Sequence, residues 1–214
     1  YLHLRVGDRL ILTADESPGE PAKYDNSGHV LSPARIGCTL PEILEQVKAG
    51  ERIWFDDGKI GGVIEHAGPD SLQIKITHAS LGGSKLRSDK GINLPDSTLA
   101  LPALTRKDRE DLAFIARHAD IVALSFANSA EDVRDLKQAL TEFGAEQPGI
   151  VLKIETLTGF RHLPDMLLEA MSSPACGVMI ARGDLAVESG FERLAELQEE
   201  ILWLCEAAHV PVIW

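Results

Sequence analysis

The sequence has 214 residues, of which 44% are hydrophobic, so it can form one large or two small globular, soluble domains with a substantial core. Its formal net charge of −12 disfavours nonspecific binding to nucleic acid and to anionic membranes, and no stretch has the pattern of a secretory signal or a membrane span. Three cysteines without metal-ligand spacing favour reduced thiols and a cytoplasmic location, and the scattered histidines disfavour a zinc site.

Residues 1–95 are predicted to form a β-rich domain. Alternation of polar and apolar residues predicts strands at 2–6, 9–13, 52–55, 59–64 and 71–77. The segment 15–32 is rich in Pro, Gly, Asp, Asn and Ser and predicts an exposed loop, whereas 42–48 predicts a short helix. Asp56-Asp57-Gly58 predicts a hairpin turn with positive φ at Gly58, and by itself it is more often a turn than a ligand site.

Residues 96–214 alternate between helical and strand patterns. Helices are expected after the N-cap residue Thr105 and at 130–143, 158–171 and 192–208. Strands are expected at 120–126, 149–155, 176–184 and from 210 onward. Strands joined through helices are parallel, so this half of the chain predicts an α/β fold.

Charged side chains follow the two central strands of this α/β region. Lys153 and Glu155 are expected on one face of the first strand, and Arg182 and Asp184 on one face of the second. In such folds the catalytic and ligand-binding residues lie at the carboxyl ends of the parallel strands. Two carboxylates beside a lysine and an arginine suit Mg²⁺ holding a phosphorylated anion, and a pair of rim salt bridges is the alternative.

Four motifs in order resemble the pyruvate kinase family. They are Lys-Gly-Ile-Asn-Leu-Pro at 90–95, Leu-Pro-Ala-Leu-Thr at 101–105, Lys-Ile-Glu at 153–155 and Ala-Arg-Gly-Asp-Leu at 181–185. The resemblance implies a partial TIM barrel at 96–214, with strands resembling the fourth to seventh of eight, and a small all-β lid domain at 1–95. The Asp-Asp-Gly turn would lie in a hairpin of that lid.

The resemblance further implies a glycolytic phosphotransferase that moves a phosphoryl group from phosphoenolpyruvate to ADP and gives pyruvate and ATP. The implied cofactors are Mg²⁺ or Mn²⁺, together with K⁺ whose ligands would lie outside this chain. Lys153 matches the catalytic lysine that faces the transferring phosphoryl group, and Glu155 and Asp184 match the metal-binding carboxylates. No nucleic-acid or membrane partner is implied, and a homo-oligomer of the full-length protein stays open.

The remaining site residues also follow from matching positions. Ser125, Phe126, Arg182 and Gly183 match positions that bind the substrate. Asp57 and Lys90 match the nucleotide side of the site, in the lid and the hinge.

Three positions depart from the family pattern: Asp89 replaces a lysine, Asn128 lacks the arginine common nearby, and Thr156 replaces an asparagine. Early barrel strands and a downstream threonine of the family are also missing, so we expect a fragment that is inactive alone. These departures leave open a catalytically silent module that binds a metabolite or a partner. Another magnesium enolate enzyme on a TIM barrel, such as an aldolase, is a weaker alternative, because it does not explain the lid and hinge motifs.

Overall fold

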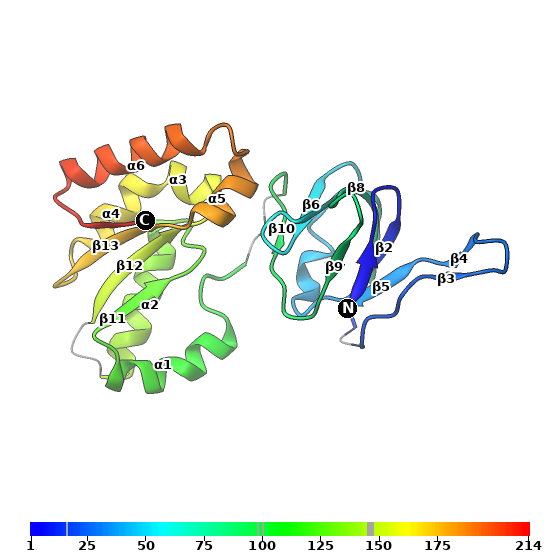
Figure 1. Ribbon diagram of the computed structural model, residues 1–214. Helices are drawn as coiled ribbons and strands as arrows, with labels where there is room; N and C mark the ends of the chain where they lie inside the picture. Colours follow the sequence, from blue (N-terminus) through cyan, green and yellow to red (C-terminus); the bar gives the residue numbers. More distant parts are fainter. Residues whose placement is uncertain (16, 98, 100, 145–147) are drawn as a thin grey trace. The chain divides into compact units, whose positions relative to one another are not determined.

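The computed structural model describes residues 1–15, 17–97, 99, 101–144 and 148–214. The chain divides into two compact units, Tyr1–Ala100 (unit 1) and Leu101–Trp214 (unit 2), and each is described by itself. Figure 1 shows that unit 1 is built mainly of strands, whereas unit 2 combines strands with helices.

Unit 1 is organised around a six-stranded sheet with the order β10-β6-β7-β8-β2-β5. Its strands are β2 (Arg9–Thr13), β5 (Ala34–Gly37), β6 (Arg52–Phe55), β7 (Ile60–Ala67), β8 (Ser71–His78) and β10 (Ile92–Asn93). The predicted hairpin is confirmed, because β6 and β7 pair antiparallel across the turn at 56–59. Gly58 has the expected positive φ, of 81°, and Asp56 and Asp57 also adopt positive φ.

Alternation along the strands builds the core of unit 1. In β8, Leu72, Ile74 and Ile76 are fully buried, whereas Gln73 and Lys75 face solvent. Period-two alternation places the apolar set on one face, and burying each such side chain contributes about 1.5–3 kcal/mol. The sheet is therefore held by one inner apolar face.

Unit 1 differs from the predictions in two places. The expected loop at 15–32 contains a hairpin of β3 (Lys23–Tyr24) and β4 (Val30–Ser32), whose turn is closed by the Asp25 carboxylate accepting from backbone N–H groups. The expected helix at 42–48 is only a 3-10 turn, η1 (Pro41–Ile43), which begins after Leu40 without a side-chain cap. Two further short strands, β1 (Leu2–Leu4) and β9 (Ser84–Leu86), pair with each other.

Unit 2 contains a parallel sheet with the order β11-β12-β13-β14. Its strands are β11 (Ile121–Leu124), β12 (Gly149–Ile154), β13 (Cys176–Ile180) and β14 (Val212–Ile213). Its helices are α1 (Arg106–His118), α2 (Ala130–Glu142), α3 (Leu157–Arg161), α4 (Leu163–Ala170), α5 (Arg182–Ser189) and α6 (Leu194–Ala207). Leu152, Val178 and Ile180 are buried together with Leu136, Met166 and Ile201 of the helices, so the core lies between sheet and helices.

Two predictions in unit 2 are wrong in detail. The strand expected at 176–184 ends at Ile180, and α5 begins at Arg182, so Arg182 and Asp184 lie in a first helical turn. The helix expected at 158–171 is two helices, α3 and α4, which meet at His162. Pro164 in the first turn of α4 has no N–H to continue the hydrogen bonding of α3, which explains the break. No helix within the described part of the chain is long and apolar enough to cross a bilayer.

Candidate active site at the carboxyl edge of the parallel sheet

The carboxyl ends of β11, β12 and β13 place the predicted residues of unit 2 along one edge of the sheet. Leu124 pairs with Leu152, and Ile154 pairs with Ile180, so these strands are in register up to that edge. Ser125 and Phe126 follow β11, Lys153 and Glu155 lie at the end of β12, and residues 182–184 follow β13.

Lys153 is the centre of this edge. Its Nζ donates to Ser125 Oγ at 2.9 Å and lies 2.6 Å from Glu155 Oε1. The Lys153 side chain is 25% exposed, whereas that of Glu155 is 2% exposed. The ammonium group is thus fixed by a serine on one strand end and a buried carboxylate on the next, yet it remains accessible from solvent.

Glu155 is held by the backbone as well as by the lysine. The Phe126 N–H donates to Glu155 Oε2 at 2.8 Å. Phe126 has φ of 50°, a left-handed conformation that costs energy for a residue with a large side chain. This conformation is stabilised by a hydrogen bond to a charged acceptor, and such bonds are stronger than neutral ones.

The first turn of α5 supplies the third part of the site. Ala181 precedes the helix, and its methyl side chain makes no capping hydrogen bond to the first turn. Arg182 and Gly183 are exposed there, and a Cβ added at Gly183 would meet only open space. A helix N-terminus with a neighbouring arginine attracts anions such as carboxylates and phosphates.

The donor set fits Mg²⁺ in part. Glu155 and Asp184 offer carboxylate oxygens, the ligands that this ion prefers, and Mg²⁺ commonly takes one or two carboxylates and completes its shell with water and substrate oxygens. Among the described residues there is no group of three or more His, Cys, Asp or Glu side chains able to hold a metal. A Mg²⁺ ion held by these two carboxylates would complete its shell with water or with oxygens of a ligand.

A second layer of contacts, which the sequence did not reveal, fixes the loops around the site. The Thr156 hydroxyl donates to Asn128 Oδ1 and accepts from the Gly159 N–H, and His162 Nδ1 lies 2.7 Å from the Asn128 carbonyl. These contacts join the loop after β11 to the loop after β12. Asn128 and Thr156 are noticeable in the sequence only as departures from a family pattern, which gives no indication that they contact each other.

In unit 1, the structure gives a partner for Lys90, one of the two predicted nucleotide-side residues. Lys90 Nζ lies 2.9 Å from Asp56 Oδ1, and Lys59 Nζ lies 3.0 Å from the same oxygen. The two lysines hold the pKa of the Asp56 carboxyl below its usual range, Lys90 contributing more than Lys59. Asp57 is exposed in the adjoining turn, so the residue that contacts Lys90 is Asp56, which the sequence reasoning did not select.

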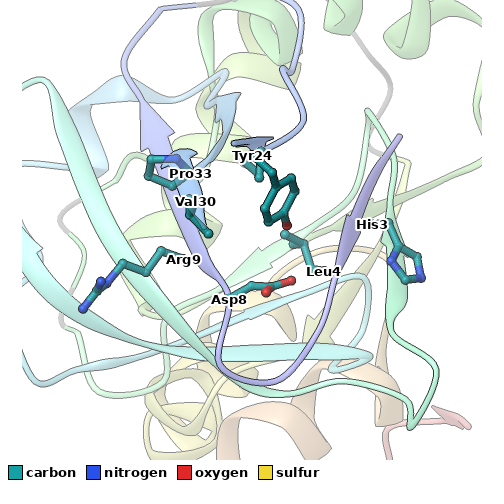
Figure 2. A pocket seen from close by; sticks show the side chains of 9 residues that line it. His3, Leu4, Asp8, Arg9, Tyr24, Val30 and Pro33 are labelled. Atoms are coloured by element: carbon teal, nitrogen blue, oxygen red, sulfur yellow. The ribbon is translucent and has the colours of Figure 1, made fainter. Parts of the chain in front are cut away.

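A small cavity in unit 1 lies apart from these residues. His3, Asp8 and Tyr24 contribute to its wall, and Figure 2 shows the Tyr24 hydroxyl directed toward the side where Asp8 lies. Arg9, which also lines it, has its guanidinium paired with Glu65 at 2.9 Å. None of the predicted site residues lines this cavity.

Comparisons with known proteins place the whole chain in one family. A family model described as "Pyruvate kinase, barrel domain" matches residues 2–214. The chain is 33% identical over 213 residues to a pyruvate kinase of Geobacillus stearothermophilus, a match that covers 99% of this chain and 33% of the relative. It is 36% identical over 208 residues to pyruvate kinase PKLR of Rattus norvegicus, covering 97% of this chain and 33% of the relative.

The chain thus spans about a third of the length of these curated relatives. The match to a barrel-domain model and the parallel sheet with its helices agree that unit 2 is part of an α/β barrel. The chain belongs to the pyruvate kinase family.

Proposed function

We propose that the protein containing this chain transfers a phosphoryl group between phosphoenolpyruvate and ADP, giving pyruvate and ATP in glycolysis. The observation that carries this proposal is the Lys153 ammonium group fixed between Ser125 and Glu155 at the carboxyl edge of the sheet. Because the chain spans a third of its relatives' length, the reaction is proposed for the protein that contains it. The 214-residue chain alone is expected to show no turnover.

Lys153 would act on charge that develops during transfer. When the phosphoryl group leaves phosphoenolpyruvate, the electron pair of the broken O–P bond stays on the enolate oxygen. A fixed ammonium group stabilises that oxygen and the equatorial oxygens of the moving phosphoryl group. Ser125 and Glu155 hold the ammonium in place, so little reorganisation is needed when the charge appears.

Glu155 and Asp184 would hold Mg²⁺ or Mn²⁺, which supplies Lewis-acid stabilisation of phosphoryl and enolate oxygens when bound. Arg182 and Gly183 in the first turn of α5 would seat the substrate carboxylate, beside Ser125 and Phe126. K⁺ would be bound by residues outside this chain.

Unit 1 would supply the nucleotide side of the site. We propose that residues 1–95 form the lid of the enzyme and residues 96–214 its partial barrel, with Lys90 and Asp57 near the nucleotide phosphates. A cytoplasmic location without nucleic-acid or membrane partners is consistent with the acidic composition. A homo-oligomeric full-length protein is compatible with the proposal.

The test is a coupled assay of pyruvate release by the longer protein, with Mg²⁺ and with or without K⁺. Lys153→Ala should lower pyruvate release at least about 100-fold, as loss of one preorganised charge does in comparable sites. Lys137→Ala is the matched control. Lys137 also pairs with a glutamate, Glu169 at 2.7 Å, but this pair joins the helices α2 and α4. Release that survives loss of Lys153 would show that the site has been misplaced.

A catalytically silent module is the second candidate. The acid at Asp89, where the family has a lysine, weakens the basic contacts expected for a nucleotide, and Thr156 alters the loop after Glu155. Under this alternative the longer protein would bind phosphoenolpyruvate yet release no pyruvate with any nucleoside diphosphate. Retention of Lys153, Glu155 and Asp184 together favours the enzyme.

A further inference from the structure

Three charged side chains of unit 1 meet where the β6–β7 turn contacts the segment before β10. Lys59 Nζ and Lys90 Nζ lie 3.0 and 2.9 Å from the same oxygen, Asp56 Oδ1. The two ammonium nitrogens are therefore less than 6 Å apart, since each lies within 3.0 Å of that shared atom. One carboxylate cannot neutralise two ammonium groups, so these three side chains together carry one positive charge, and the exposed acids Asp57 and Asp89 adjoin Asp56 and Lys90 in sequence.

The exposure of the trio is uneven. The Asp56 side chain is 10% exposed, whereas those of Lys59 and Lys90 are 62% and 37% exposed. Each ammonium has three N–H donors, and the contact with Asp56 occupies one of them. The carboxylate is thus covered, while the donors of both lysines face solvent and remain available to an anion.

The backbone fixes this arrangement. The Asp56 N–H donates to the Gly91 carbonyl at 3.1 Å, and β10, which begins one residue later, pairs with β6 through Ile92 and Phe55. Asp56 and Asp57 have φ of 51° and 54°, a conformation that residues other than glycine rarely adopt. The turn and the segment carrying Lys90 are therefore joined before any ligand binds, and preorganised sites lose less entropy on binding.

We propose that Lys59 and Lys90 together bind the diphosphate group of a nucleoside diphosphate, with Asp56 as the positioning residue that holds the two ammonium groups side by side. This inference rests on the proposed function for Lys90 and adds Lys59 and Asp56 to it. Lys59 supplies a second positive charge in a chain that has Asp89 where the family has a lysine. Two adjacent ammonium groups suit an anion whose oxygens are spread over two neighbouring phosphorus atoms.

The test measures binding rather than turnover, so it can be made on the 214-residue chain. Magnesium pyrophosphate is titrated by calorimetry, because its cation offsets the exposed carboxylates of Asp57 and Asp89, which adjoin Asp56 and Lys90 in sequence. We expect a dissociation constant on the order of a millimolar, as for solvent-accessible ion pairs. Lys59→Gln and Lys90→Gln should each weaken binding about fivefold, and Lys59→Arg should retain most of it.

Lys23→Gln is the matched control. Lys23 is also an exposed lysine paired with a carboxylate, Glu20 at 3.6 Å, but it lies on the β3–β4 hairpin. Its replacement should leave pyrophosphate binding unchanged. If Lys59→Gln weakens binding no more than Lys23→Gln, or if the unaltered chain binds no pyrophosphate, the inference is overturned.

Asp56→Asn separates positioning from simple charge. Removing the carboxylate adds one positive charge to the site, so a purely electrostatic site would bind pyrophosphate more tightly. A positioning role predicts weaker binding, and it predicts that Lys59→Gln costs less in the Asp56→Asn background than in the original chain. Tighter binding by Asp56→Asn would refute the positioning role.

The outcome is independent of the reaction assay. Pyrophosphate binding that depends on Lys59 would stand even if the longer protein released no pyruvate, and the phosphoryl-transfer proposal would then fail alone. Conversely, pyruvate release that depends on Lys153, with no effect of Lys59→Gln on either pyrophosphate binding or the KM for ADP, would overturn this inference alone.

Discussion

At the residue scale, Glu155 combines deep burial with a partner for each carboxylate oxygen. Oε1 lies beside the Lys153 ammonium, and Oε2 accepts from the Phe126 N–H. Both neighbours are donors, so the site requires an acceptor on each side. Replacing one oxygen of the buried Glu155 carboxylate by an NH₂ group would therefore place two donors against each other.

Glu155→Gln should therefore destabilise unit 2, although it preserves the volume of the side chain. The amide NH₂ must face either the Lys153 ammonium or the Phe126 N–H, and one donor is left without an acceptor, at a cost of about 1–3 kcal/mol. Urea unfolding of the 214-residue chain measures the change. Glu199→Gln, an exposed position in α6, is the control, and equal stability of the two variants would contradict the hydrogen-bonding pattern described for Glu155.

The position of Lys153 and Glu155 at a strand end could be predicted from the sequence, whereas their partners could not. Lys153 and Glu155 follow an apolar run, and this position indicates the end of a buried strand. The contact between Lys153 and Ser125 joins residues 28 positions apart and depends on the register of β11 against β12. Contacts within the β6–β7 turn could not be predicted either. The sequence indicated Asp57, whereas the backbone conformation of the turn brings Asp56 into contact with Lys90.

At the element scale, the β6–β7 hairpin depends on a glycine for close packing. A Cβ added at Gly61 would lie 2.4 Å from the Trp54 ring, which stands opposite it on the paired strand. The ring also packs against His78, with centroids 5.5 Å apart, so it has a neighbour on another side. The indole therefore has to move if Gly61 gains a side chain.

Gly61→Ala should destabilise unit 1 by about 1–3 kcal/mol, the usual cost of forcing an extra carbon into a packed site. Thermal unfolding followed by Trp54 fluorescence, in a background in which Trp203 and Trp214 are replaced by Phe, measures both the loss of stability and the displacement of the ring. Gly82→Ala is the matched control, because a Cβ at Gly82 meets nothing within 4 Å. A Gly61→Ala variant as stable as Gly82→Ala would mean that the Trp54 ring moves aside at little cost in free energy.

The helix starts of unit 2 show which local signals are reliable. Thr105 caps α1 by accepting from the Asp108 N–H, while the Asp108 carboxylate accepts from the Thr105 N–H, as the sequence predicted for the cap. The start of α5 was missed because Ala181 gives no capping signal and the apolar run before it continues the strand pattern. Local chemistry therefore predicts capped helices better than an uncapped helix that begins directly after a strand.

Thr105→Ala should cost about 1 kcal/mol of stability in unit 2, because the Asp108 N–H loses its acceptor. Thr105→Asn should recover most of that loss, since an asparagine oxygen can cap in the same position. Unfolding in urea, followed by far-ultraviolet circular dichroism, distinguishes the two variants. Equal losses for alanine and asparagine would show that the capping hydrogen bond contributes little.

At the scale of the whole molecule, the chain has two separate hydrophobic cores. Leu10, Ile53 and Ile74 belong to the core of unit 1, whereas Leu152, Met166 and Ile201 belong to that of unit 2. Composition allowed one large or two small domains, and the change from strand patterns to alternating helices and strands near residue 95 indicated the boundary between two. The pairing order of the sheet in unit 1 could not be predicted, because β2 does not pair with the strands that adjoin it in sequence. It pairs with β5, in parallel, and with β8, antiparallel.

Unit 1 should lose stability in acid. Hydrogen bonding from Lys90 and Lys59 lowers the pKa of Asp56, hydrogen bonding from Arg9 lowers that of Glu65, and hydrogen bonding from Arg52 lowers that of Asp96. A carboxyl whose folded pKa lies below its unfolded pKa contributes stability that is fully present above the unfolded value. Unfolded carboxyls titrate near pH 4, so this contribution is present above about pH 5 and is lost as the pH falls through the lower, folded pKa values.

The measurement uses a Trp203→Phe/Trp214→Phe variant, in which Trp54 is the one tryptophan left and reports on unit 1 alone. Its thermal midpoint should be level between pH 7 and about pH 5 and should fall steadily toward pH 3. Arg52→Gln should start from a lower midpoint and show a shallower fall, because Asp96 then loses the guanidinium that lies 2.6 Å from it. A midpoint that stays constant or rises in acid would show that these ion pairs, which are partly exposed, do not stabilise the folded unit.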